Sequence, residues 1–281
     1  MNGKKTWRQS NIGRLAALCT WGVCGLVALG AAGCEDKPTA TNIAPTSTAL
    51  APSKPASMGA QKFAVDRAGS KVSFMMEAPQ EKIRGRVDGA TTGDLNINLD
   101  DITKTTGLID VDISGIELFQ TKQDDKGKFG EETKNELQNK HVRAWLEISP
   151  DAPDDVRAKN SKIQFSITSV ETSGEKNISK LTGPERKVIF TAKGDFLLHQ
   201  HKGQKAFDLE ATFKFEGDRP VSVAVKTVKP FPVDLAEYDV KPREAFGKLA
   251  QKTLEILAPK VAKEALVTID VTAKSLGPAN P

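Results

Sequence analysis

Cysteine is scarce in this chain of 281 residues and is confined to its beginning. The three cysteines are Cys19, Cys24 and Cys34, so nothing after residue 34 can form a disulfide or act as a thiol nucleophile. The G-x-S-x-G motif of serine hydrolases is missing as well. Nucleophilic catalysis therefore has little support, and a domain of this length can bury a core that needs no disulfides.

An excess of either charge is also missing once the first residues are set aside. The formal net charge is +4, from 40 Lys and Arg against 36 Asp and Glu. Residues 1–33 hold four of the basic residues and no acidic one, which leaves 36 of each in the remainder. Net charge therefore gives no argument for a nucleic-acid partner.

The N-terminal segment has the layout of a secretory signal. Four basic residues precede an apolar run over 15–33, which ends in small residues directly before Cys34. Small residues before a lone cysteine resemble a bacterial lipobox, although Ala31 stands where leucine is usual. We expect residues 1–33 to be a lipoprotein signal peptide and Cys34 to be the lipidated first residue of the mature chain. The protein would then be anchored to a membrane of the bacterial cell envelope, facing the periplasm or the surface. An uncleaved membrane anchor and ordinary secretion are the alternatives.

Residues 34–60 have the composition of a linker. Four prolines stand among Ser, Thr and Ala, and the segment has no apolar periodicity. Such a composition buries too little apolar surface to fold, so we predict a disordered linker.

Alternating apolar and polar residues recur through 61–281 and indicate one β domain. The clearest example is 193–217, where two alternating runs flank a turn near residue 200 with charged residues between the apolar positions. Further alternating runs lie at 72–76, 95–99, 109–113, 162–172, 221–228 and 265–274. Together these runs indicate roughly eight to ten strands in about 220 residues, which is the number expected of a closed antiparallel barrel. We predict an all-β fold, an antiparallel barrel of about eight strands with one or two short helices.

Two stretches depart from strand alternation and favour helices. Residues 131–142 are rich in Glu, Lys, Asn and Gln, and we expect Leu137 and Val142 to face inward. Residues 243–258 show apolar positions at helical spacing between Pro242 and Pro259, so this helix is expected to cover the barrel surface or one end.

Five motifs, in their order along the chain, resemble the YceI-like family of bacterial envelope proteins. They are FAVDRAGSKVSF at 63–74, IRGRVDGATTGDLNI at 83–97, SKIQFSITSVE at 161–171, GDFLLH at 194–199 and EALVTIDVTAK at 264–274. The resemblance covers nearly all of 62–274. It implies a lipocalin-like β-barrel whose apolar interior holds a polyisoprenoid chain, with no established enzyme chemistry.

On this resemblance we expect a polyisoprenoid or similar long apolar molecule as the ligand, for carriage or storage, with no cofactor and no catalytic residue. The expected ligand-binding residues are the inward apolar ones: Phe74, Met76, Phe165, Ile167, Phe196, Leu198, Phe207, Leu209 and Phe213. From patterning alone, the same residues would form an ordinary dry core. A structural or interaction lipoprotein with a solid barrel and no ligand is therefore the alternative.

The histidines offer a second candidate site. His199 and His201 form an H-x-H pair, which on a strand would place both rings on one face, as in some zinc sites. The remaining histidine, His141, lies on a separate segment, and an acidic residue would have to complete a site. We expect a solvated pair near the turn that binds no metal; a metal-assisted enzyme using the pair is a third alternative.

Overall fold

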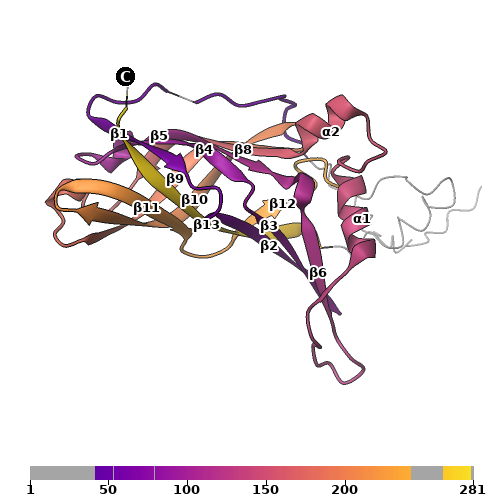
Figure 1. Ribbon diagram of the computed structural model, residues 1–281. Helices are drawn as coiled ribbons and strands as arrows, with labels where there is room; N and C mark the ends of the chain where they lie inside the picture. Colours follow the sequence, from indigo (N-terminus) through magenta and orange to yellow (C-terminus); the bar gives the residue numbers. More distant parts are fainter. Residues whose placement is uncertain (1–41, 53, 79, 242–261, 280–281) are drawn as a thin grey trace, which may run out of the picture. The chain divides into compact units, whose positions relative to one another are not determined.

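Eight antiparallel strands close into a barrel within the part of the chain that the structure describes (Figure 1). The computed structural model describes residues 42–241 and 262–279, except 53 and 79. Each strand pairs with the next in the ring, and β13 pairs with β1 to close it. The predicted all-β barrel of about eight strands is confirmed. In ring order the strands are β1 (Ala60–Val65), β4 (Thr91–Asn98), β5 (Thr106–Asp112), β8 (Lys162–Glu171), β9 (Glu185–Leu198), β10 (His201–Glu216), β11 (Arg219–Thr227) and β13 (Glu264–Pro278).

The last strand, β13, is long enough to pair with four others. One edge pairs with β1 and then with β2 (Lys71–Ala78), and the other edge with β11 and then with β12 (Phe231–Asp234). From β2 the sheet continues through β3 (Glu81–Asp88) and β6 (Glu117–Lys122) to β7 (Thr133–Lys134). The sheet therefore branches at β13, and β6 extends away from the ring (Figure 1).

The hairpin of β9 and β10 follows the predicted alternation. Phe207 and Phe213 are buried, whereas the residues that follow them, Asp208 and Lys214, are exposed. The two strands meet at His199 and Gln200, whose φ angles are 49° and 60°. Positive φ at both turn residues matches the twist of the flanking strands in a two-residue hairpin.

Two α-helices lie at the same end of the barrel, α1 (Glu136–Trp145) and α2 (Asp154–Asn160) (Figure 1). Helix α1 begins later than predicted because the Asn135 side chain accepts hydrogen bonds from the backbone N–H groups of Leu137 and Gln138. Val142 is buried as predicted, but Leu137 is 60% exposed, so its predicted inward position is wrong. Leu137 lies in the first turn, where Asn139 takes the buried position instead. The predicted helix over 243–258 lies outside the described residues.

Three single turns of 3-10 helix complete the described elements. They are η1 (Ile102–Lys104), η2 (Ile113–Gly115) and η3 (Ile178–Lys180), and each buries its isoleucine in the core.

The part of the expected linker that the structure describes is bonded to the barrel. The described residues of 42–58, here called the N-terminal strap, bond first to the turn between β9 and β10 and then to β8. The Leu50 N–H donates to Gln164 Oε1 (2.7 Å), and the Ser166 hydroxyl donates to the Ala51 carbonyl (2.7 Å). The prediction of a disordered linker therefore fails for the strap, because β8 supplies partners for its backbone groups.

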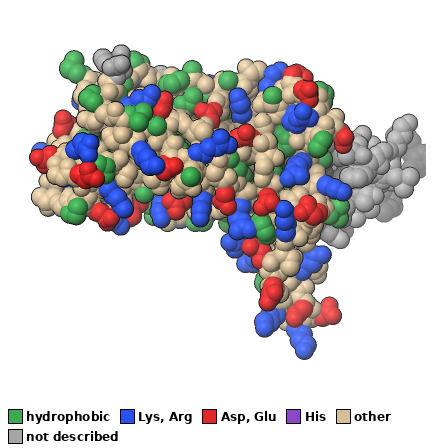
Figure 2. All heavy atoms as spheres, in the orientation of Figure 1, with side chains coloured by type: hydrophobic (Ala, Val, Ile, Leu, Met, Phe, Trp, Pro, Cys, Tyr) green, Lys and Arg blue, Asp and Glu red, His purple; other side chains and the backbone are tan. Residues whose placement is uncertain are grey.

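The outer surface mixes both signs of charge. Figure 2 shows acidic and basic side chains interspersed over the barrel and over the segment that extends from it. None of the helices in the described ranges is long and apolar enough to cross a membrane.

Candidate functional site

A long apolar cavity of about 210 Å³ lies inside the barrel. Of the 38 described residues that line it, 35 are apolar and none is charged. On β9 the lining runs from Phe190 to Leu198, which is about 26 Å of strand, or about 20 Å along the barrel axis at the usual strand tilt. The space is therefore long and narrow, a shape that suits an extended chain.

Every one of the nine residues predicted to bind the ligand lines this cavity. Alternation on a strand fixes which side chains share a face, so identifying one inward residue identifies the others on that strand. Their contact with a ligand stays a prediction. The nine are Phe74, Met76, Phe165, Ile167, Phe196, Leu198, Phe207, Leu209 and Phe213.

Phe207 is the centre of an aromatic cluster in the cavity wall. Its ring centroid lies 4.0 Å from that of Phe231, 4.6 Å from Phe165 and 6.3 Å from Phe196. Such ring pairs contribute beyond the area they bury. The sequence pattern did not predict that Phe231 lines the cavity, because β12 is only four residues long and contains Pro232.

Phe74 reaches the cavity across a glycine on the neighbouring strand. It pairs with Gly85 of β3, and a Cβ at Gly85 would lie 2.0 Å from a carbon of the Phe74 ring. Any larger residue at position 85 would displace Phe74 from the wall.

Different residues border the cavity on the side of β1 and on the side of α1. On the side of β1, Phe63, which is fully buried, packs edge-on against Phe213 with ring centroids 6.3 Å apart. On the side of α1, Val142, Trp145 and Leu146 from α1 and the residue after it join the lining. Trp145 and Leu146 lie beyond the predicted end of the helix, so the sequence pattern did not reveal them.

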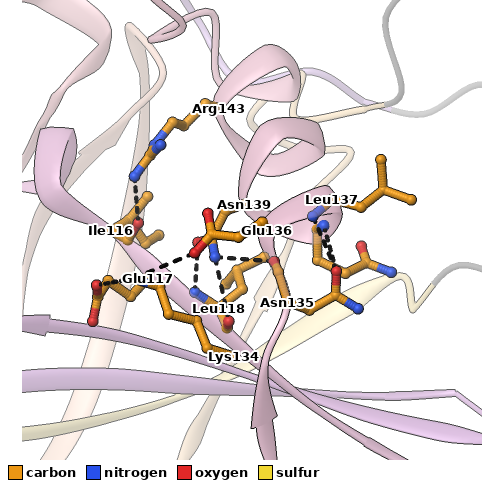
Figure 3. Close-up of polar contacts among 10 residues, drawn as sticks. Ile116, Glu117, Leu118, Lys134, Asn135, Glu136, Leu137, Asn139 and Arg143 are labelled. Carbon is orange, nitrogen blue, oxygen red and sulfur yellow. Dashed lines mark hydrogen bonds and ion pairs between the residues drawn. The ribbon is translucent and has the colours of Figure 1, made fainter.

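A buried asparagine holds α1 in this position (Figure 3). Asn139 is 1% exposed, and its Oδ1 accepts the backbone N–H of Leu118 on β6 at 2.7 Å. Its amide group donates to the Asn135 carbonyl at 3.0 Å, and Arg143 donates to the Ile116 carbonyl at 3.3 Å. These bonds fix α1 to β6 and to Ile116, which lines the cavity.

Few polar atoms are available inside the cavity. The hydroxyls of Thr91 and Thr105 are buried, and neither has a hydrogen-bond partner in the described part of the chain. Gln164, the third polar lining residue, bonds to the strap through its side-chain oxygen. An apolar ligand with one or two polar groups could form hydrogen bonds with the hydroxyls of these two threonines.

The histidine pair lies outside the cavity. The prediction that both histidines are solvated is wrong for His199. His199 is 4% exposed, with Nδ1 3.2 Å from the Tyr238 carbonyl and Nε2 3.0 Å from Glu147 Oε2. Nδ1 of His201 lies 2.6 Å from the Ala44 carbonyl of the strap. The prediction failed because three segments distant in sequence pack against the turn.

The segment after β12 also brings an acidic residue, Asp239, close to the histidine pair. A carboxylate oxygen of Asp239 and one ring nitrogen from each of His199 and His201 lie within 4.8 Å of one another. The neighbouring Tyr238 is fully buried, and this burial raises the pKa of its phenol. Asp239 is therefore in a position to complete a set of three metal ligands with the histidine pair.

The chain was compared with curated protein sequences and with solved structures. No curated protein sequence matches the chain. Among solved structures, a polyisoprenoid-binding domain from Saccharophagus degradans, implicated in plant cell wall breakdown, is 12% identical and aligns over 76% of this chain and 98% of its own, with a TM-score of 0.47. BcnA from Burkholderia cenocepacia is 13% identical over 75% of this chain and 99% of its own, with a TM-score of 0.45.

The family comparison covers the whole cavity. The model of the YceI-like domain matches residues 63–273, a range that includes every residue lining the cavity. The chain thus belongs to the YceI-like family.

Proposed function

We propose that the protein binds a polyisoprenoid or a similar long apolar molecule in its barrel and carries or stores it. The cavity supports this proposal, because it is long, narrow and almost entirely apolar. A hydrocarbon gains about 0.8 kcal/mol for each methylene that it buries, so a featureless chain needs area more than hydrogen bonds. Phe and Met side chains in the wall adapt to such a chain.

The size of the cavity favours a ligand over a solid core. An engineered apolar cavity of about 150 Å³ stays dry and binds benzene. The cavity in this barrel is larger, about 210 Å³, and its lining is as apolar. A structural lipoprotein whose barrel is packed solid would leave no such space.

Binding without catalysis fits the lining. Among the described residues that line the cavity there is no histidine, carboxylate, lysine, tyrosine or cysteine, so they include no side chain that commonly acts as a general acid or base. We therefore assign no reaction and no cofactor to the cavity.

The ligand can be identified in organic extracts of the purified protein. Mass spectrometry is expected to find a long-chain apolar compound in roughly stoichiometric amount. Ala211→Phe should reduce its yield, because Ala211 lines the cavity and is 1% exposed. Ala224→Phe is the matched control, since Ala224 on β11 is half-buried and does not line the cavity. An extract of the parent without any such compound, or equal yields from both variants, would contradict the proposal.

We further propose that Cys34 carries the lipid that anchors the protein in the cell envelope. The layout of residues 1–34 supports this location. Cys34→Ala should abolish incorporation of labelled fatty acid and leave the signal segment uncleaved, whereas Cys24→Ala should be processed like the parent. A Cys34→Ala protein that is lipidated normally would show that the anchor lies elsewhere.

A further inference from the structure

Strained backbone is concentrated around the histidine pair. Across the described ranges, the non-glycine residues with positive φ are Glu147, His199, Gln200 and Asp239, at 54°, 49°, 60° and 53°. All four line one surface hollow of about 280 Å³, together with residues 46–48 of the strap. Each such residue costs about 1–3 kcal/mol, and strain of this kind gathers at functional sites.

The same hollow brings together the side chains of a metal site. The ligand atoms of His199, His201 and Asp239 lie within 4.8 Å of one another. Ligands bound about 2.1 Å from a tetrahedral zinc ion stand about 3.4 Å apart, so an ion requires closure by at most about 1.4 Å. Two imidazoles and one carboxylate favour zinc and related transition metals over calcium or magnesium.

The hydrogen bonds of the two rings orient lone pairs in a way that suits an ion. Nδ1 of His201 donates to the Ala44 carbonyl, so the lone pair of the neutral ring is on Nε2. Both ring nitrogens of His199 face oxygen atoms, the Tyr238 carbonyl and the Glu147 carboxylate. With Nε2 held by the Glu147 carboxylate, an ion at Nδ1 would take the place of the hydrogen bond to the Tyr238 carbonyl.

We propose that His199, His201 and Asp239 bind one zinc ion, and that the Glu147 carboxylate orients the ring of His199. A bond from the second ring nitrogen to a carboxylate or carbonyl is the usual support of a metal-bound histidine. Here the supports are Glu147, two residues after α1, and the Ala44 carbonyl of the strap. Through its ligands and their supports, the ion would join the segments after α1 and β12 and the strap to the β9–β10 turn, with its remaining coordination position open to the hollow.

Zinc titration of Asp239→Asn tests the site. The chain is purified without a histidine tag, stripped with a chelator and titrated with zinc against a fluorescent chelator. Asparagine is the replacement of choice because it adopts positive φ readily and keeps the shape of aspartate. Asp239→Asn should lose at least about tenfold in zinc affinity. Asp218→Asn is the control, since Asp218 is exposed in the turn after β10.

Thermal unfolding gives a second, independent measurement. Zinc should raise the midpoint of the parent and of Asp218→Asn but not that of Asp239→Asn, because a ligand of the native state alone stabilises it. The cysteines near the N-terminus are present in all of these proteins, so the difference between them reports the site. His201→Gln, whose amide can still donate to the Ala44 carbonyl, replaces Asp239→Asn if the latter does not fold. Equal zinc affinity in parent and variant, or midpoints that zinc leaves unchanged, would overturn the proposal.

Discussion

Replacing Phe207 with alanine tests whether the cavity is a ligand-binding site or only an empty space in the packing. Phe207 is 3% exposed and contacts three other rings in the cavity wall. Its loss in the ligand-free protein should cost about 3–5 kcal/mol, the usual range for removing a buried phenylalanine. At about 2–4 °C per kcal/mol for a domain of this size, the thermal midpoint should fall by about 6–20 °C.

Phe207→Ala should lower the thermal midpoint of the ligand-loaded protein more than that of the protein stripped of ligand. A ligand present at 100 times its Kd stabilises the parent by about 2.7 kcal/mol, which is about 5–11 °C in midpoint. If Phe207→Ala weakens binding tenfold, the stabilisation falls to about 1.4 kcal/mol, and the gap between the loaded and stripped midpoints is halved.

Calorimetry on loaded and stripped samples measures the difference between the two thermal midpoints, here called the gap, for the parent and for Phe207→Ala. Phe119→Ala is the matched control, because Phe119 does not line the cavity and instead stacks under the guanidinium of Arg86, 3.9 Å from its ring centroid. It should lower both midpoints and leave the gap unchanged. A parent with no gap, or a Phe207→Ala protein with the parent's full gap, would refute a ligand in the cavity.

Three further predictions follow from buried polar groups. Asn139→Ala should lower the free energy of unfolding in urea by about 1–3 kcal/mol, because the Leu118 N–H loses its acceptor, whereas Leu137→Ala on the exposed side of α1 should change it by less than about 0.5 kcal/mol. Burial raises the pKa of Tyr238, so its contribution to stability is complete below about pH 10 and is lost as the pH rises further. Since Tyr238 is the single tyrosine, tyrosinate absorption should appear only together with unfolding; its appearance at pH 10 with intact circular dichroism would contradict this. Thr91→Val should raise the stability of the ligand-free protein by about 1 kcal/mol by removing an unbonded hydroxyl, and a lower midpoint in calorimetry would show that the hydroxyl is satisfied.

The barrel and its lining could be predicted because alternation is a local signal. In β10, apolar and polar residues alternate from Phe207 to Phe213, which assigns each side chain to the inside or the outside without knowledge of the partner strands. Strand β3 was harder to recognise, because Gly85 interrupts its apolar face and becomes understandable only beside Phe74 of β2.

The histidine site could not be predicted because its partners are remote in sequence. Glu147 lies 52 residues before His199, and Asp239 belongs to a loop after the short strand β12. The strap was missed for a related reason. Its proline-rich composition indicates disorder, and no local pattern shows that Gln164 and Ser166 of β8 supply hydrogen bonds to it.

The position of β13 at the end of the chain sets the order in which the protein can fold. Closing the ring pairs Phe63 with Ser275, and joining residues that far apart costs about 4.7 kcal/mol in loop entropy, whereas the β9–β10 hairpin closes across two residues. Hydrogen exchange during refolding should therefore protect β9 and β10 before β1. Until Glu264–Pro278 has been synthesised, β1, β2, β11 and β12 lack their common neighbour, so a chain that is still being synthesised keeps an open barrel.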